Sequence, residues 1–239
     1  MNEQEWYDQV EESLKKRGIQ YREEQIQKSA VFLKQVWEAN RRLNLTGACN
    51  ESELLEKHFL DSLSLLEFYD LGKEKWCDLG SGAGFPGIPL KIFFPASELY
   101  ILESSRKKIN FIKRSLQFIE TRGVHLLHGR AENYGREEKW RGKFKFITCR
   151  AVAGLRVLVE LGMPFLCEGG SMYLYKGPQL EKEIEQAGNA LQLCNGKIVE
   201  QKEYRLSNGE IRKIINIKKK GPTPERYPRR EGVPEKKPL

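Results

Sequence analysis

The sequence predicts an α/β fold, in which a mostly parallel sheet is covered by helices on both faces and preceded by a helical extension. Residues 3–69 repeat apolar side chains at helical spacing and show no strand pattern. From residue 76 onward, short apolar runs alternate with amphipathic segments, which is typical of βα units. Near the end, two apolar segments flank Asn208-Gly209, a hairpin signal that predicts an antiparallel closing pair of strands.

The first 70 residues are expected to form the helical extension. Trp6, Val10 and Leu14 recur every fourth residue, so they share one helix face, and Gly18 is a suitable end for that helix. The third helix begins near Ser52, which can act as an N-cap. The predicted helices span residues 3–17, 22–42 and 51–69.

Residues 71–220 are expected to hold the sheet. Five strands alternate with helices, and right-handed crossovers between them make these strands parallel. The closing hairpin adds two strands, so the sheet has seven. The predicted strands are 76–80, 98–104, 124–129, 144–151, 171–177, 197–206 and 210–218, and the predicted helices are 87–94, 105–121, 157–166 and 179–192.

Composition favours a soluble protein of 239 residues, long enough for one large domain with a small appendage. No apolar run approaches the ~20 residues that span a bilayer, and the acidic N-terminus lacks the features of a signal peptide. The five cysteines are scattered without a C-x-x-C pair, which argues against zinc sites and disulfides. We therefore expect a cytoplasmic protein with no metal and no membrane partner.

The net charge is +8, and nearly all of the excess lies near the end of the chain. From Lys197 onward, thirteen Lys or Arg stand against six Glu. Such a localised basic region is typical of a protein that binds a polyanion, although it could simply aid solubility. Residues 221–239 are rich in proline and lack a periodic apolar face. We interpret them as a basic tail that either becomes ordered on binding or packs back over the domain.

Residues 78–89, DLGSGAGFPGIP, gather four glycines between the first strand and a helix. Gly82, Gly84 and Gly87 fit the pattern G-x-G-x-x-G, the fingerprint of dinucleotide binding. Glu103 follows about 20 residues later at the end of the next strand, where a ribose-binding acid belongs. On this pattern alone, an NAD-type dinucleotide-binding oxidoreductase is one candidate, and a glycine turn without a ligand is another.

Acidic residues follow three successive strands and favour a different cofactor. Asp78 ends the first strand beside the loop, where a carboxylate can accept hydrogen bonds from an ammonium but would repel a pyrophosphate. Glu103 and Glu132 follow the second and third strands, within reach of a ribose and an adenine. S-adenosylmethionine has an ammonium, a ribose diol and an adenine, and carries no phosphate. The three acids together therefore favour S-adenosylmethionine.

These motifs, in this order, resemble the bacterial 16S ribosomal RNA guanine-N7 methyltransferases, also called the glucose-inhibited division protein B family. The resemblance covers about the whole chain, and the prolines around Gly87 and the tail motif are specific to that family among methyltransferases. One departure is Glu103, where the family often has aspartate. The matching segments are Asn44-Leu45-Thr46, His58 to Leu63, Asp78 to Gly87, Glu103 to Lys108, Gly129 to Glu132, Arg150-Ala151, Lys176-Gly177 and Tyr227 to Pro234.

The resemblance implies a class I S-adenosylmethionine-dependent methyltransferase with a Rossmann-like sheet, which methylates ring nitrogen 7 of a guanine in 16S ribosomal RNA. Because that nitrogen has a lone pair and no proton, the reaction needs no general base, and positioning of the reactants suffices. The implied partner is the small ribosomal subunit, and we expect the protein to act as a monomer. The residues implied at the cofactor are Asp78, Gly80, Gly82, Gly84, Phe85, Glu103, Ala131, Glu132 and Arg150.

Arg150, at the end of the fourth strand, is the residue expected to be catalytic. Its guanidinium could pair with oxygen 6 of guanine, or it could form an ion pair with an acid of the cofactor site. Asn44, His58 and Asp61 belong to the helical extension and are expected to cover the cofactor and form the guanine pocket. Since His58 and Asp61 share one helix face, a His–Asp pair that only supports helix packing is the alternative.

Contacts to RNA are expected from basic residues beyond the fifth strand, in the hairpin and in the tail. Lys176 follows the fifth strand and Arg212 lies in the hairpin. Arginines beside Tyr227 can bind phosphate and stack on a base. The tail candidates are Arg226, Arg229 and Arg230. An RNA-binding chaperone that has lost catalysis is a third candidate, against which the complete glycine loop and the three acids argue.

Overall fold

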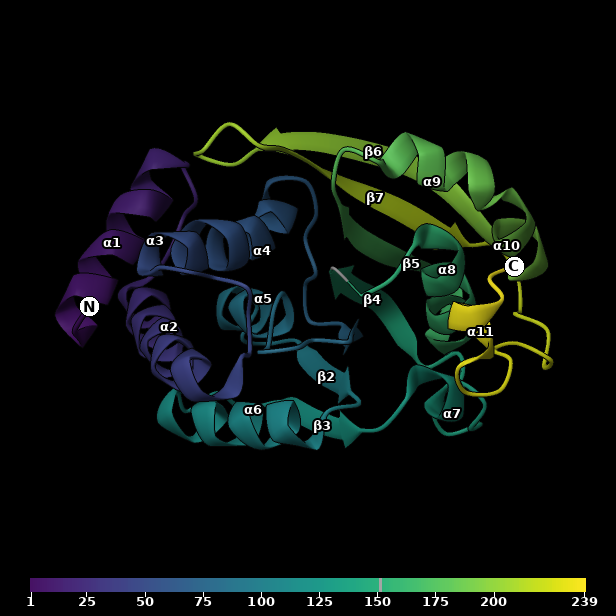
Figure 1. Ribbon diagram of the computed structural model, residues 1–239, viewed down its shortest axis with the longest axis horizontal. Helices are drawn as coiled ribbons and strands as arrows, with labels where there is room; N and C mark the ends of the chain where they lie inside the picture. The colour runs from purple at the N-terminus through teal and green to yellow at the C-terminus, as the bar shows by residue number, and fades with distance from the viewer. Residues whose placement is uncertain (151) are drawn as a thin grey trace.

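The computed structural model describes residues 1–150 and 152–239 and contains one seven-stranded sheet (Figure 1). The strands are β1 (Lys75–Leu79), β2 (Glu98–Glu103), β3 (Val124–His128), β4 (Phe144–Arg150), β5 (Leu166–Lys176), β6 (Gly196–Arg205) and β7 (Ile211–Lys219). Their order is β3-β2-β1-β4-β5-β7-β6, with β7 antiparallel to β5 and β6 and the other pairs parallel. This arrangement confirms the predicted fold class. Ala151, part of one matching motif, lies outside the described residues.

Helical segments precede the sheet, as predicted, but the third is irregular. The expected helix at 51–69 begins after Asn50, which caps it in place of Ser52, and its middle is a π-helical turn. Such π turns are frequent at functional sites because they alter which backbone carbonyls are free. The segments are α1 (Glu3–Lys16), α2 (Glu23–Leu43), α3 (Glu51–Leu54), the π turn η1 (Leu55–Leu60), α4 (Asp61–Leu63) and the 3-10 turn η2 (Ser64–Glu67).

The remaining helices cover the two faces of the sheet. They are α5 (Gly87–Phe93), α6 (Arg106–Phe118), α7 (Ala131–Tyr134), α8 (Leu155–Gly162), η3 (Met163–Phe165), α9 (Leu180–Gln186), α10 (Gly188–Leu193) and α11 (Val233–Lys236). Successive residues of a strand point to opposite faces. Accordingly, Trp76 packs with α5, α6 and the N-terminal helices, whereas its neighbour Cys77 packs with α8 and α10. The sequence did not predict α7 and α11, since four residues are too few for an apolar period to emerge.

The helical extension shares a hydrophobic core with the sheet. Trp6, Phe32 and Phe59 are fully buried, in the same cluster as Trp76 and Ile112. This packing holds η1 and α4 in a fixed position relative to the strands, and the candidate site depends on that position.

The C-terminal tail, residues 221–239, folds back over the domain beside α7 and α8 (Figure 1). Arg141 donates hydrogen bonds to three backbone carbonyls of the tail, including that of Tyr227 at 2.7 Å. Arg229 binds Glu160 of α8 through two side-chain hydrogen bonds of 2.9 and 2.7 Å. Of the two interpretations of the tail, the structure therefore shows the one in which it packs back over the domain.

The five cysteines are free thiols, and three of them are buried. Within the described residues, no helix is long and apolar enough to cross a bilayer. The same part of the chain holds no group of three or more His, Cys, Asp or Glu side chains arranged to bind a metal ion.

Candidate active site

The glycine loop after β1 turns sharply at the carboxyl edge of the sheet. Gly80, Gly82 and Gly84 have positive φ angles of 70°, 61° and 103°, which residues with a side chain rarely adopt. At Gly80, an added Cβ would also lie 2.5 Å from Val152 Cγ2, so this position requires glycine. The loop thus brings bare backbone to the edge where open α/β sheets bind ligands.

Asp78 lies beneath this loop, although we expected it to meet the ammonium of a cofactor. Its side chain is fully buried and accepts hydrogen bonds from Gly87 N–H at 3.0 Å and from Thr148 Oγ1 at 2.9 Å. Burial raises the pKa of Asp78 to about 6, and the hydrogen bonds partly offset that rise. We therefore correct its role: Asp78 fixes the glycine loop to β1 and β4.

The other two acids lie at the same edge of the sheet, Glu103 at the end of β2 and Glu132 in α7. Glu103 accepts hydrogen bonds from Gly82 N–H at 3.0 Å and from Ser105 N–H at 2.8 Å. A carboxylate offers about four acceptor positions, so roughly two remain for the hydroxyls of a ribose. Glu132 is buried and accepts a hydrogen bond from Gly232 N–H of the tail at 3.0 Å. The tail therefore helps to orient this carboxylate.

A cavity of about 160 Å³ opens beside the loop, between apolar side chains of β1, β2 and α8. Ala131 and Glu132 line it at the start of α7. Its wall also holds polar groups, among them the carboxylates of Glu132 and Glu235. Apolar side chains beside a carboxylate suit an adenine ring, whose amino group can donate to that carboxylate. Gly80 lines the cavity as well, whereas Gly82 and Gly84 shape the loop without lining it.

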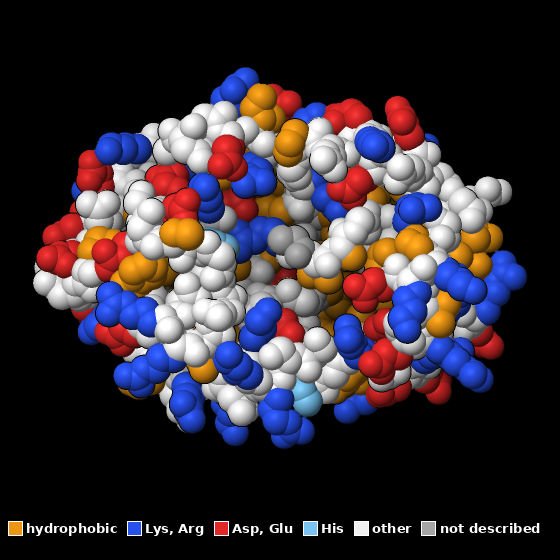
Figure 2. Space-filling model, in the orientation of Figure 1, with side chains coloured by type: hydrophobic (Ala, Val, Ile, Leu, Met, Phe, Trp, Pro, Cys, Tyr) orange, Lys and Arg blue, Asp and Glu red, His pale blue; other side chains and the backbone are white. Residues whose placement is uncertain are grey.

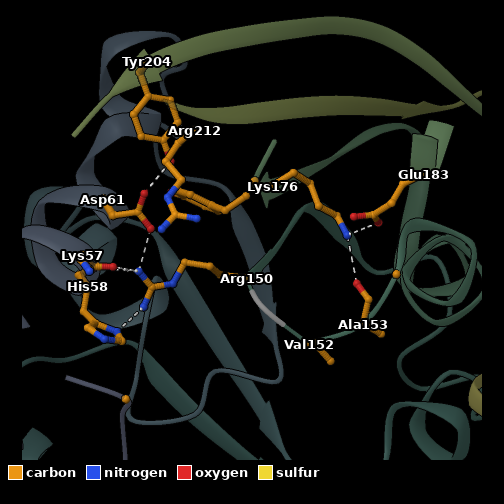
Figure 3. A pocket seen from close by; sticks show the side chains of 14 residues that line it. Lys57, His58, Asp61, Arg150, Val152, Ala153, Lys176, Glu183, Tyr204 and Arg212 are labelled. Carbon is orange, nitrogen blue, oxygen red and sulfur yellow. Dashed lines mark hydrogen bonds and ion pairs between the residues drawn. The ribbon is translucent and has the colours of Figure 1, made fainter. Parts of the chain in front are cut away.

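A larger cavity of about 610 Å³ adjoins the first, since Val152 and Ala153 line both. Figure 2 shows a hollow at the centre of this face, with basic, acidic and histidine side chains in its wall. The side chains come from η1, α4, β4, β5 and the β6–β7 hairpin, and Arg150 reaches from the end of β4 towards His58 and Asp61 (Figure 3).

Arg150 joins the sheet to the helical extension. Its Nη1 donates to Asp61 Oδ2 at 2.8 Å and to the carbonyls of Lys57 and His58 at 2.9 and 3.2 Å. The two charged side chains are only 12% and 7% exposed. The guanidinium also lies 5.4 Å from the centroid of the Phe85 ring. The ion pair of Arg150 is therefore with an acid of the extension rather than with an acid of the cofactor site.

The contact with Arg150 defines the protonation of His58. Arg150 Nη2 lies 3.0 Å from His58 Nδ1. Because a guanidinium can only donate, Nδ1 accepts, and the neutral ring carries its proton on Nε2. Burial, assisted by the charge of Arg150, lowers the pKa of His58 to about 4. His58 thus lines the larger cavity as a neutral imidazole, and Arg150 joins it to Asp61.

Folding stability should depend on pH through His58. Its pKa is about 4 in the folded protein and about 6.5 in an unfolded chain, so the unfolded chain binds the proton more readily between these values. The stability contributed by neutral His58 is therefore present above pH ~6.5 and lost as the pH falls towards ~4, by on the order of 1–3 kcal/mol. The free energy of unfolding, measured in urea, should fall less between pH 7.5 and 5 for His58→Gln than for the wild type. His128→Gln, at an exposed position, is the control, and a His58→Gln variant that behaves like it would contradict the prediction.

Side chains that no motif singled out complete the site. Tyr204 donates its hydroxyl to Asp61 at 2.6 Å, and Tyr175 donates its hydroxyl to the carbonyl of Ser62 at 2.6 Å. Asn40 Oδ1 accepts hydrogen bonds from two amides of the loop after α2, each at 2.8 Å. The two tyrosine contacts connect segments 143 and 113 positions apart in the sequence, so no local pattern indicated them.

Asn44 and Phe85 line neither cavity, although we expected both to contact ligands. Asn44 ends α2 in the left-handed conformation, with φ of 46°, and is exposed. Phe85 is buried between Phe32 and His58, with ring centroids 5.3 and 5.5 Å away. The structure therefore assigns a helix cap to Asn44 and a packing contact beneath His58 to Phe85.

Lys176 and Arg212 both line the larger cavity. Lys176 pairs with Glu183 at 2.7 Å, and Arg212 pairs with Glu210 at 2.6 Å. Arg212 Nε is buried and finds no hydrogen-bond partner in the described parts of the chain. A buried donor without a partner is costly, and an acceptor on a ligand would satisfy it.

The three tail arginines differ in their surroundings. Arg226 and Arg230 are exposed, and the Arg226 guanidinium lies 5.1 Å from the centroid of the Tyr227 ring. Arg229 is bound to the fully buried carboxylate of Glu160. We therefore keep Arg226 and Arg230 as candidates for RNA contact and correct Arg229 to a residue that anchors the tail.

Comparison with known proteins identifies relatives over the whole chain. The family model of GidB, rRNA small subunit methyltransferase G, matches residues 25–214. Ribosomal RNA small subunit methyltransferase G of Streptococcus pyogenes serotype M1 is 40% identical over 241 residues, covering 100% of both chains. The protein of the same name from Alkaliphilus metalliredigens is 42% identical over 224 residues, covering 93% of this chain and 94% of the relative.

Solved structures share the architecture at low sequence identity. A predicted O-methyltransferase from Agrobacterium tumefaciens has a TM-score of 0.54 and 19% identity, covering 70% of this chain and 81% of its own. TYW2 of M. jannaschii, in complex with AdoMet, has a TM-score of 0.53 and 13% identity, covering 67% and 74%. These likenesses concern the fold alone, while the matches along the sequence show that the chain belongs to the rRNA small subunit methyltransferase G family.

Proposed function

We propose that this chain transfers the methyl group of S-adenosylmethionine to ring nitrogen 7 of a guanine in 16S ribosomal RNA. The observation that carries the proposal is the pair of adjoining cavities at the carboxyl edge of the sheet. The smaller is lined by apolar side chains of β1, β2 and α8 together with the carboxylates of Glu132 and Glu235, and Arg150 and His58 lie in the wall of the larger. Membership of the family supports ribosomal RNA as the substrate.

The smaller cavity fits the adenosine part of S-adenosylmethionine. Ala131 and Glu132 would hold the adenine, and Glu103 would accept hydrogen bonds from the ribose. When bound, S-adenosylmethionine supplies an electrophilic methyl group on a positively charged sulfur. The family match gives the alternative of an NAD-type oxidoreductase no support.

The larger cavity would supply hydrogen-bond donors rather than a base. Guanine nitrogen 7 carries no proton, so no residue has to remove one. Arg150 can donate to oxygen 6 of the guanine through a guanidinium N–H that is not bound to the extension, and His58 can donate to it through Nε2–H. Both contacts leave nitrogen 7 free. The methylated base is cationic, and the carboxylates of Asp61 and Glu183 nearby favour that charge. The rate then derives mainly from orientation across the two joined cavities.

Basic residues around the larger cavity would bind the RNA backbone. Arg212 offers its unpartnered Nε, and Lys176 lies on the same wall. Arg226 and Arg230 extend the basic surface into the tail. In this proposal the protein acts as a monomer in the cytoplasm, on the 16S RNA of the small ribosomal subunit.

Methyl transfer from labelled S-adenosylmethionine tests the proposal, with unmodified small subunits, naked ribosomal RNA and a protein mixture as acceptors. We expect the label in 16S RNA, recovered as 7-methylguanosine after digestion, and none in protein. Cofactor binding with no label on any RNA would reject the substrate. Failure to bind S-adenosylmethionine, with binding of NAD, would return the glycine loop to the dinucleotide alternative. Tight RNA binding without cofactor binding would favour a chaperone.

A further inference from the structure

A groove of about 980 Å³ runs between α2 and α6, separate from the two cavities of the candidate active site. Arg41, Arg42 and one acid, Glu38, line it from α2, and Lys107, Arg114 and Phe118 line it from α6. The three α6 residues lie seven and four positions apart, so they share one helix face. Figure 2 shows Lys and Arg side chains gathered along the lower edge of the molecule, where Figure 1 places α6 and the nearby part of α2.

The cations of this groove lack acidic partners. Arg41, Arg42, Lys107 and Arg114 are exposed, and no ion pair within 4 Å joins any of them to an acid of residues 1–150 or 152–239. On α1, by contrast, the exposed lysines Lys15 and Lys16 pair with glutamates one helical turn away. Unpaired cations on two facing helices repel one another, and an anion bound between them would remove that repulsion.

Other groups give the groove the features of a nucleic-acid site. Phe118, in the groove wall, is 61% exposed. Ser115 Oγ, in the groove wall, is buried and has no hydrogen-bond partner in the described chain. An exposed aromatic ring can stack on a base, and an unpartnered hydroxyl can donate to a phosphate oxygen.

The groove leads away from the active site. The loop after α2 contains Gly47, which lines the larger cavity, and α6 begins two residues after Ser104, which lines the smaller one. Lys107 therefore lies three residues from the wall of the smaller cavity, whereas Arg114 is about 10 Å further along the helix axis. An RNA with a guanine in the larger cavity can continue along this surface.

We propose that the groove between α2 and α6 binds the phosphate backbone of an RNA segment outside the one that carries the target guanine. This inference rests on the proposed function and adds a second contact surface for the same substrate. Charge complementarity favours RNA, because unpaired cations line both walls of one groove and Phe118 stands at its far end. The sequence did not indicate this surface, because its two halves are more than 60 positions apart.

The variant Arg41→Gln/Arg42→Gln/Arg114→Gln tests the proposal. Its KM for small subunits should rise about tenfold or more, and the salt dependence of KM should become less steep by about one unit per lost phosphate contact. The kcat and the affinity for S-adenosylmethionine should stay at wild-type values. The control variant replaces three exposed lysines with glutamine at the amino-terminal ends of β4 and β6 and should leave KM unchanged. These lysines are Lys143, Lys145 and Lys197.

An unchanged KM and salt slope in the groove variant, with an active wild type, would overturn this inference and leave the proposed function standing. A wild type that methylates no RNA would overturn the proposed function itself. Equal losses in the groove and control variants would indicate diffuse attraction and would also reject the groove. Loss of binding to vesicles of anionic lipid, with an unchanged KM for subunits, would reassign the surface to a membrane.

Discussion

Arg150→Gln should slow methyl transfer by about 10- to 100-fold. A hydrogen bond from a charged donor contributes about 1.5–3 kcal/mol, and the substrate guanine would lose it. In addition, Asp61, which is 7% exposed, would keep its hydrogen bond from Tyr204 but lose its only cation among the described residues. Leaving a buried charge without its partner costs about 3–5 kcal/mol. Single-turnover rates at saturating subunit measure the first effect, and urea unfolding measures the second.

The double variant Arg150→Gln/Asp61→Asn separates the contact with guanine from the support of the fold. It buries no unpaired charge, and the amide oxygen of the new residue can still accept from Tyr204. Its free energy of unfolding should return towards the wild-type value, while methyl transfer should stay slow. Recovery of the rate in this variant would show that Arg150 only holds the extension in place. Arg205→Gln, at an exposed position of β6, removes the same charge and should alter neither quantity.

The fold could be predicted because its signals are local. Strand and helix patterns follow one another within windows of a few residues, and Asn208-Gly209 marks the hairpin directly. Among the strands, the exception is β5, which begins at Leu166, five residues before the predicted start. Gly169 and Gly170 interrupt its apolar pattern, and the irregular pairing of the start of β5 with β4 accommodates them. A glycine-interrupted strand therefore looks like a loop in the sequence.

The site could be predicted only in outline. The glycines and acids located the ligand-binding edge, since they follow the strands directly. Their individual roles depend on burial, which left Asp78 under the loop and brought Glu132 into contact with the tail. The bond from Arg150 to Asp61 spans 89 positions, and the bond from Tyr204 to Asp61 spans 143. Pairings at such separations are products of tertiary packing, and nothing in the local sequence indicates them.

Arg229→Gln should weaken the binding of S-adenosylmethionine by about tenfold or more, although Arg229 lines neither cavity. Arg229 donates from its backbone N–H at 2.8 Å and from its side chain to Glu160, which is fully buried. Three residues on, Gly232 N–H orients Glu132, and Glu235 lines the smaller cavity. If the tail detached, the cofactor site would lose one wall, and Glu132 would lose the donor that orients it. A hydrogen bond to a charged group contributes about 1.5–3 kcal/mol.

Two further variants make this expectation decisive, with calorimetry of S-adenosylmethionine binding as the measurement. Arg226→Gln/Arg230→Gln removes two charges from the same tail but no contact with α8, so it should weaken RNA binding and leave cofactor affinity unchanged. Glu160→Gln/Arg229→Gln removes the buried charge along with its partner, so the protein should stay folded while cofactor affinity remains low. The Arg226→Gln/Arg230→Gln variant is expected to lower RNA affinity alone. If Arg229→Gln had the same effect, the tail would be an RNA-binding arm with no part in the cofactor site.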